Sequence, residues 1–315
     1  MSQALQFQIN ETTGQRLDVF LASRLGWLSR MRIANLLAQG ACAVNDMAAH
    51  AGYHVRRGDL VRITLDEGAP TAMRPEAVPL EITYEDDDLL VVVKPAGMLV
   101  HPTRGVKTGT LANALAYHLN RMRIEDDNAP SAEEHLDYGG SNLPSMVRPG
   151  ITHRLDRATS GLMVIAKHQR ALSILSRHFH HRLVEKRYLA LLHGRVVEDN
   201  CLISAPIGRD PEAQPKWGVM ESGKPAETRL RVLERRDGLT LVELEPITGR
   251  TNQLRIHCAH LGHAIIGDEL RSPATSTRLC LHAARLAFHH PANGDWMEFN
   301  SPLPAELATV LESNP

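Results

Sequence analysis

One acidic residue stands between two arginines in the stretch HRLDRATSGLMVIAK. Arg154 and Arg157 flank Asp156, a polar turn follows, and an apolar run occupies residues 162–166. An arginine nearby favours the ionised form of a carboxylate, and an ionised, partly desolvated carboxylate can attack or deprotonate a sugar carbon. The same pattern is also typical of a surface ion pair ahead of a core strand. Spacing alone leaves both interpretations open.

The residues after Asp156 are suited to hold its loop in place. The hydroxyl groups of Thr159 and Ser160 can bond to the backbone, and Gly161 permits a tight turn. The apolar segment LMVIA then predicts a buried strand that anchors the loop in the core. Rigid support behind an exposed carboxylate is what a catalytic position requires.

The charges of the 315-residue chain are unevenly distributed. The formal net charge is −1, which argues against a uniformly basic coat for nucleic acid. However, residues 12–65 hold seven arginines against three aspartates, and residues 147–187 hold nine Lys or Arg against two acids. Two basic patches on a nearly neutral chain indicate a polyanionic partner that touches part of the surface.

The composition predicts neither a membrane protein nor a secreted one. No apolar run approaches the roughly 20 residues needed to span a bilayer, and the N-terminal residues MSQALQFQIN lack the pattern of a secretory signal. The four cysteines have no paired spacing, which predicts reduced thiols and a cytoplasmic location.

Histidines are numerous, and two groups suggest metal binding at first sight. HFHH ends at His181, and in HCAHLGH the residues His257 and His260 would share one face of a helix. There is no HExxH motif, no paired CxxC and no obvious acid to complete a ligand set. We therefore expect these histidines to serve in packing, at the surface or in contacts with the polyanionic partner, and we expect no metal site.

The first 66 residues predict a small module of two helices and short strands. RLDVFLASRL and SRMRIANLLAQ each place apolar side chains on one helical face, and Gly40 follows where a C-terminal glycine is expected. Asn45-Asp46 predicts a turn between short strands. Four arginines are placed to grip phosphates, or else to form a solvated charged face: Arg30, Arg32, Arg56 and Arg57.

The order RLDVFLASRL, SRMRIANLLAQGACAVN and VRRGDLVRI resembles the α-L RNA-binding domain of the ribosomal S-four type over residues 14–65. The resemblance implies a module that docks two short helices and a turn onto structured RNA. It departs from the family at Asn45-Asp46, where Asn-Gly is usual, although aspartate also tolerates a turn.

The rest of the chain predicts a linker and a larger α+β domain. Residues 67–79 are rich in Pro, Ala and Gly without periodicity, as linkers are. Residues 80–315 contain long strands with hairpin turns and a few helices, which indicate a mixed sheet with flanking helices. Residues 121–146 have many breakers and no period, and we expect a mobile insertion there.

RPGITHRLDRATSGLMVIAK resembles the signature of RluA-type pseudouridine synthases, which isomerise uridines within RNA. KPAGMLVHP lies upstream of it, and EKRYLALLHG, ITGRTNQLRIHCAHLGHAIIGD and LHAARLAFHHP follow in the family's order. The match covers roughly residues 80–310 apart from the insertion. It implies the pseudouridine synthase fold, a mixed and largely antiparallel bent sheet with flanking helices.

Carried over position by position, the resemblance makes Asp156 the catalytic aspartate. It makes Arg154 the arginine that helps hold the flipped nucleotide and Tyr188 the aromatic residue that packs on the target base. Arg255 matches the basic residue that pairs with the aspartate. One position departs from the pattern: Asn252 stands where the family commonly has His, which leaves the role of that position open.

The implied reaction requires no cofactor, because it involves neither redox change nor hydrolysis. Whether the carboxylate attacks the anomeric carbon or removes the 2′ proton is left open by the sequence. The combination with the N-terminal module resembles members that act on large-subunit ribosomal RNA, and transfer RNA remains an alternative substrate. A catalytically silent RNA-binding or ribosome-assembly factor and a metal-dependent hydrolase are the other hypotheses. We expect a monomer.

Overall fold

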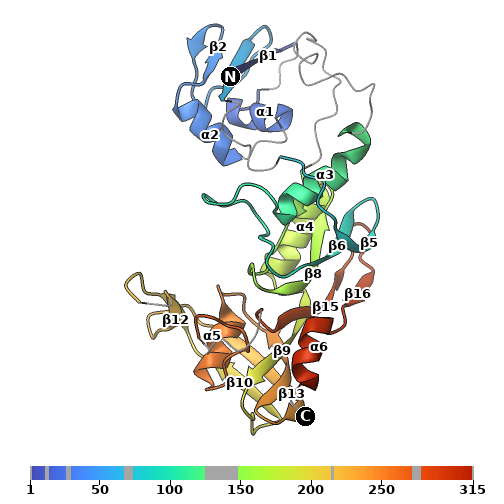
Figure 1. Cartoon of the computed structure of the whole chain (residues 1–315). Helices are drawn as coiled ribbons and strands as arrows, with labels where there is room; N and C mark the ends of the chain where they lie inside the picture. Colours follow the sequence, from blue (N-terminus) through green and yellow to red (C-terminus); the bar gives the residue numbers. More distant parts are fainter. Residues whose placement is uncertain are drawn as a thin grey trace. The chain divides into compact units, whose positions relative to one another are not determined.

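The computed structural model describes most of the chain, in the ranges 2–10, 14–25, 30–66, 74–124, 148–213, 216–271 and 278–313. The chain divides into two compact units, shown in Figure 1. The first unit comprises Met1–Pro79 and His101–Pro149, and the second comprises Leu80–Val100 and Gly150–Pro315. Among the helices of these described ranges, none is long and apolar enough to cross a membrane.

The first unit contains a four-stranded antiparallel sheet with the order β1-β4-β2-β3. Its elements are β1 (Ser2–Gln8), α1 (Leu17–Arg24), α2 (Arg30–Ala38), β2 (Cys42–Val44), β3 (Met47–Ala48), β4 (Leu60–Asp66) and α3 (Leu111–Ile124). The predicted apolar faces of α1 and α2 are confirmed, because Leu17, Phe20, Ile33 and Leu36 are buried in one cluster with strand residues. The sequence patterns did not reveal β1.

Residues with positive φ form the turns of this unit. Gly40 follows α2 at φ +73°, and Asn45 and Asp46 join β2 to β3 at φ +52° and +63°. Gly58, at φ +93°, precedes β4. The turns predicted at Gly40 and Asn45-Asp46 are therefore confirmed. Asn and Asp adopt the left-handed region more readily than other side chains do.

The described part of the expected linker is held by hydrogen bonds. Residues 74–79 have no regular secondary structure, but the Arg74 carbonyl accepts a bond from Asn113 Nδ2 at 2.8 Å. The Glu76 carboxylate accepts one from the Gly109 N–H at 2.7 Å. Residues 67–73 lie outside the described residues. The expected domain division at residues 66 and 80 stays a prediction.

Helix α3 continues to Ile124. The predicted mobile insertion at 121–146 therefore begins within the last turn of a helix. The remainder of that segment, 125–146, lies outside the described residues.

The second unit is built on a ten-stranded mixed sheet, which confirms the predicted fold class (Figure 1). The path runs β10-β13-β14-β9-β15-β8-β6-β5, with β16 beside β15 and β7 beside β8. The β8–β15 pair is parallel and the other pairs are antiparallel. The strands of this sheet are β5 (Glu81–Glu85), β6 (Leu89–Lys94), β7 (Gly150–Ile151), β8 (Ser160–Ala166), β9 (Glu185–His193), β10 (Asn200–Ser204), β13 (Glu227–Arg236), β14 (Leu239–Pro246), β15 (Leu281–His289) and β16 (Trp296–Asn300).

Two further strands pair with each other, and helices pack on the large sheet. These elements are β11 (Ile207–Arg209), β12 (Trp217–Val219), α4 (Gln169–His180), α5 (Gln253–His260) and α6 (Ala305–Glu312). Leu175 of α4 is buried in a cluster with β6, β8 and β15. Leu254 of α5 and Leu307 of α6 join a second cluster around β9 and β14. The loop that carries Asp156 leads directly into β8 and so into this core.

Gly161 sits where β8 meets β15. It has φ +120°, and a Cβ atom built there would overlap the carbonyl oxygen of Ala283. The register pairs Gly161 with Ala283 and Ser160 with His282. Only glycine permits this approach of the two backbones, which fixes the strand directly after the Asp156 loop.

We therefore expect Gly161→Ala to destabilise the second unit by about 3 kcal/mol, because it adds both a backbone clash and a disfavoured φ. Urea unfolding followed by circular dichroism measures this change. Gly218→Ala on β12 is the matched control, because its Cβ would meet nothing within 4 Å. Equal stability of the two variants would contradict the assignment of this close approach.

Candidate functional site

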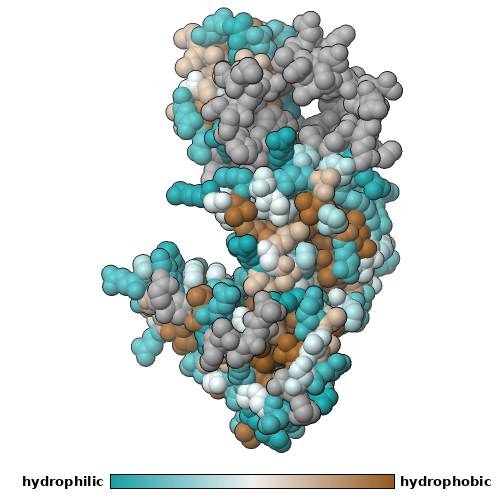
Figure 2. All heavy atoms as spheres, viewed as in Figure 1, coloured by the Kyte–Doolittle hydropathy of each residue, from teal (hydrophilic) through white to brown (hydrophobic). Residues whose placement is uncertain are grey.

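A cavity of about 830 Å³ lies beside Asp156 in the second unit. Most of its wall comes from three segments: residues 153–159, the end of α4 with the start of β9, and residues 245–255, which lead from β14 into α5. Arg229 of β13 and Leu281 of β15 complete it. Figure 2 shows the surface hollowed between the region of α4 and the lobe that carries β12 and α5. A cavity of this volume lies within the range of ligand-binding pockets.

Asp156 is half-buried in the wall of this cavity. Its carbonyl oxygen accepts a bond from the Thr159 N–H at 3.1 Å, which closes the turn predicted there. Within the described ranges, its carboxylate has no hydrogen bond or ion pair. Arg154 is exposed and bonded to no acid there, and Arg157 donates its Nε–H to the Gly97 carbonyl at 2.9 Å. The flanking arginines therefore do not pair with Asp156, so the surface ion pair that their spacing left open is not formed in the described residues.

A buried lysine fixes the backbone of the Asp156 loop. Lys94 is 0% exposed, and its Nζ donates to the carbonyl oxygens of Pro95, Met98 and Arg157 at 2.7, 2.9 and 3.3 Å. Burial lowers the pKa of Lys94 to about 8; the charge of Arg278 acts in the same direction, and that of Asp156 opposes it. The ammonium group therefore stays charged at neutral pH and ties two loops together.

Tyr188 also lines the cavity, from the central strand β9. It is paired in register with Leu244 of β14 and Ala283 of β15, so its backbone is held on both sides. Burial raises the pKa of the Tyr188 phenol, and the negative charge of Asp156 raises it further. The structure thus brings Asp156 and Tyr188 within electrostatic reach of each other, with the phenol protonated.

Arg255 reaches the same cavity from α5, but its direct partner is Asp268. Arg255 Nε and Nη2 donate to the two carboxylate oxygens of Asp268 at 2.9 and 2.6 Å. Arg271 Nη1 lies 3.6 Å from the same carboxylate, which is fully buried. Burial lowers the pKa of Arg255, but the Asp268 bonds and the charges of Asp268 and Asp156 give a net rise. The expected pairing with Asp156 is thus replaced by an electrostatic interaction without a bond.

The loop before α5 is held by Gln253, which sequence reasoning missed. Its Oε1 accepts bonds from Thr248 Oγ1 and the Arg250 N–H, at 2.7 and 3.0 Å. Its Nε2 donates to Thr228 Oγ1 at 3.0 Å, and Thr228 in turn bonds to His257 Nδ1 at 2.9 Å. No local pattern pointed to Gln253, because its amide joins segments that lie far apart along the chain.

Known proteins match this chain over nearly its full length. The family model for RNA pseudouridylate synthase matches residues 88–260. The uncharacterized RNA pseudouridine synthase YlyB of Bacillus subtilis is 38% identical, over 96% of this chain and 95% of its own length. The chain belongs to the RNA pseudouridylate synthase family. It therefore isomerises uridine to pseudouridine in RNA, as the sequence motifs predict.

Two further comparisons agree with this assignment. Ribosomal large subunit pseudouridine synthase D of Nitrosomonas europaea is 37% identical to this synthase, over 95% of this chain and 84% of its own length. The solved structure of human RNA Pseudouridylate Synthase Domain Containing 1 is similar with a TM-score of 0.56 and 27% identity, over 76% of this chain and 98% of that one.

His257, one of the candidate metal ligands of the synthase, is engaged in hydrogen bonds. It is fully buried, and its Nε2 bonds to the Ala205 carbonyl oxygen at 3.0 Å while its Nδ1 bonds to Thr228. Both ring nitrogens are thus used to pack α5 against neighbouring segments, which agrees with the packing role expected for this histidine.

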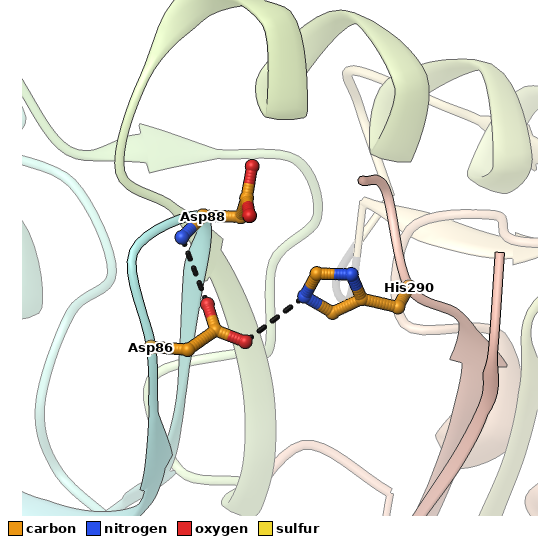
Figure 3. Close-up of side chains that lie close together, drawn as sticks. All are labelled: Asp86, Asp88 and His290. Carbon is orange, nitrogen blue, oxygen red and sulfur yellow. Dashed lines mark hydrogen bonds and ion pairs between the residues drawn. The ribbon is translucent and has the colours of Figure 1, made fainter. Parts of the chain in front are cut away.

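Asp86, Asp88 and His290 form a cluster that the sequence did not indicate (Figure 3). His290 Nδ1 accepts from the Ala292 N–H, so its Nε2 carries the proton and donates to Asp86 at 2.9 Å. The Asp86 carboxylate also accepts from the Asp88 and Leu89 N–H groups and from a tyrosine hydroxyl. These four donors satisfy the carboxylate. We interpret the cluster as a set of hydrogen bonds that joins the turn between β5 and β6 to the turn after β15.

Asn252 occupies the position where the family commonly has His. It is the N-cap of α5, with φ +54° and ψ +21°, and it lines the cavity. Its Oδ1 lies 3.5 Å from Arg255 Nη1, a long contact. Asparagine is one of the few side chains that tolerate this backbone conformation, so the local geometry accounts for the residue type.

Lys94→Met should slow the reaction about 10- to 100-fold while leaving RNA affinity unchanged, because loss of the ammonium donor frees the backbone behind Asp156. Single-turnover rates and filter binding separate the two effects. Lys167→Met is the control. Lys167 also donates to a main-chain carbonyl, that of Asp86, but it follows the C-terminal end of β8, whereas the Asp156 loop precedes the N-terminal end. A similar drop in rate for both variants would point to general destabilisation instead.

Proposed function

We propose that Asp156 is the catalytic carboxylate of this synthase. The observation that carries the proposal is a half-buried carboxylate in the cavity wall that has no bonding partner in the described part of the chain. A free carboxylate is available to a sugar carbon or to its proton, whereas a paired one is not. Lys94 and Arg255 place positive charge within electrostatic reach of this carboxylate, since its charge raises the pKa of each of them.

The chemistry assigned to Asp156 is the detachment and reattachment of uracil. The bond from ring nitrogen 1 to the sugar breaks, the base turns, and a bond from ring carbon 5 to the same sugar carbon forms. The hydrogen on carbon 5 leaves as a proton, and ring nitrogen 1, freed from the sugar, takes up a proton. Attack on the anomeric carbon and removal of the 2′ proton both use one ionised carboxylate, so the arrangement supports either route.

Three residues support the reaction in this proposal. Tyr188 packs on the target base, since it lines the cavity within electrostatic reach of Asp156. Arg154 is exposed at the same wall without an acidic partner among the described residues, so its guanidinium group is available to the flipped nucleotide. Arg255 supplies positive charge while Asp268 holds it in place. Extruding the uridine costs a few kcal/mol, which stacking and phosphate contacts offset.

The proposed substrate is large-subunit ribosomal RNA. This is supported by the relative from Nitrosomonas europaea, which is named a ribosomal large subunit pseudouridine synthase and is 37% identical over 95% of this chain. Transfer RNA is the alternative substrate, and direct comparison of the two RNAs distinguishes them.

The N-terminal residues 1–66 are proposed to be an RNA-binding domain of the S-four type. The turn before β4 supports this, because Asp59 accepts bonds from Asn45 Nδ2, the Tyr53 hydroxyl and the Arg56 N–H at 2.8–2.9 Å. This bonded turn presents Arg56 and its neighbour Arg57, both exposed. Arg30, at the start of α2, is exposed as well, so cations from two segments are available to phosphates.

Asp156→Asn should lower the rate of isomerisation at least roughly 1,000-fold and leave RNA affinity within about twofold, because the amide keeps the shape but neither attacks nor accepts a proton. The assay is tritium release from RNA labelled at carbon 5 of uridine, with unmodified ribosomal RNA and bulk transfer RNA as parallel substrates. Wild-type-like release by the variant would remove Asp156 from the mechanism. No release by the wild type from either RNA would favour a silent RNA-binding factor.

Replacing Arg30, Arg32, Arg56 and Arg57 together by glutamine should weaken binding to structured RNA roughly 10- to 100-fold and flatten its salt dependence, because phosphate contacts release counterions. Filter binding over a range of salt concentrations measures both quantities. Arg24→Gln is the control, since Arg24 is exposed in the same unit but packs over the Phe20 ring. Unchanged affinity of the fourfold variant would leave this domain without its proposed role.

A further inference from the structure

Arg182 follows α4 in a backbone conformation that L-residues rarely adopt. Its φ is +59°, and the Leu183 N–H donates to the His178 carbonyl at 2.9 Å, which closes the helix end. Helices that end this way usually carry glycine at the left-handed position, because a Cβ atom is disfavoured there. Arginine therefore has a conformational cost at this position that glycine would not have.

The same chain uses glycine at two equivalent helix ends. Gly40 follows α2 at φ +73°, and Gly262 follows α5 at φ +90°. The α5 end has the same bonding pattern, since the His263 N–H donates to the Cys258 carbonyl at 3.0 Å. Among the non-glycine residues with positive φ in the described ranges, all except Arg182 are Asn or Asp. The arginine thus departs from the chain's own pattern.

This arginine at a left-handed position lies in the wall of the cavity. Arg182 lines it together with Phe179 and Lys186. Lys186 lies two residues before Tyr188 on β9, so both side chains project from the same face of the strand. Its Nζ stands 5.8 Å from the centroid of the Phe179 ring. The two cations therefore belong to the wall that also carries Tyr188.

Neither cation is neutralised by an acid in the part of the chain that the structure describes. The acid nearest in sequence, Glu185, is bonded to Arg285 at 2.6 Å. Burial lowers the pKa of Lys186, and the positive charge of Arg182 lowers it further. Two neighbouring cations without a counterion, one of them half-buried, form a site that an anion stabilises.

We propose that Arg182 and Lys186 bind the phosphodiester backbone of the RNA next to the uridine held in the cavity. This rests on the proposed function, because the reacting uridine must enter beside Asp156. A flipped nucleotide leaves its backbone at the mouth of the pocket, and the guanidinium and ammonium groups are suited to its phosphates. Binding of the phosphate explains why an arginine is present where glycine would favour the helix end.

The first test is Arg182→Gly, which separates binding from stability. We expect about tenfold weaker RNA binding and a loss of about 1 from the slope of log affinity against log salt, because one phosphate contact disappears. The melting temperature should rise by roughly 2 °C, because the strain is relieved. If the Arg182 side chain had only a structural role, its removal would lower the melting temperature and leave the salt slope unchanged.

Three further variants complete the design. Arg182→Lys keeps both the charge and the backbone strain, so it should restore most of the affinity without the gain in melting temperature. Lys186→Met keeps the stem that packs toward Phe179 and removes the charge, and should also flatten the salt slope by about 1. Arg170→Gln, at the other end of α4, removes an exposed cation as the matched control.

Binding is measured by filter retention of whichever RNA supports tritium release, in an Asp156→Asn background where the chemistry does not consume the substrate. Salt slopes for Arg182→Gly and Lys186→Met equal to that of Arg170→Gln would overturn the proposal. That outcome would leave the role of Asp156 intact, since tritium release tests it separately. Conversely, turnover by Asp156→Asn would refute the catalytic assignment without altering the phosphate contacts.

Discussion

The buried ammonium group of Lys94 makes the bonds that fix the backbone next to Asp156 in the cavity wall. Its three acceptors are main-chain carbonyl oxygens, from two loops that are distant in sequence. An isolated buried lysine tends to lose its proton, but here the pKa falls only to about 8, so the charge and its bonds persist at neutral pH. Because the lysine holds the backbone at Arg157, Asp156 is positioned without any bond to its own carboxylate.

The charges around Asp156 also leave its carboxylate without a bonding partner. A direct ion pair would lower the reactivity of the carboxylate and occupy the space that the sugar needs. Arg255 instead donates two bonds to Asp268, which is fully buried, so the guanidinium group is fixed while its charge still acts on Asp156. Burial raises the pKa of the Asp268 carboxyl, but the bonds and charge of Arg255 outweigh burial and lower it. The positive potential at Asp156 is therefore present before RNA binds.

The features that depend on local patterns could be predicted from the sequence. The apolar faces of α1 and α2, the Asn45-Asp46 turn and the strand after Asp156 follow from periodicity and turn chemistry, and the family follows from ordered motifs. The roles of Lys94 and Asp268 could not be predicted in this way, because their partners lie far away in the chain. Each of these two charged residues directly follows an apolar segment of the sequence, and this position was the sequence feature that indicated burial.

Residues with a left-handed backbone conformation differ in type between the helix ends and the cavity wall. At the ends of α2 and α5, where the chain only needs to turn, glycine adopts positive φ at little cost. In the cavity wall, Asn252 and Arg182 adopt it instead, and both residues carry side chains that can reach a ligand. Asparagine tolerates the conformation, whereas arginine has no compensating side-chain bond within the described ranges. The compensation for Arg182 must therefore come from outside the helix end, and the phosphate groups of the substrate are the ligand whose charge matches.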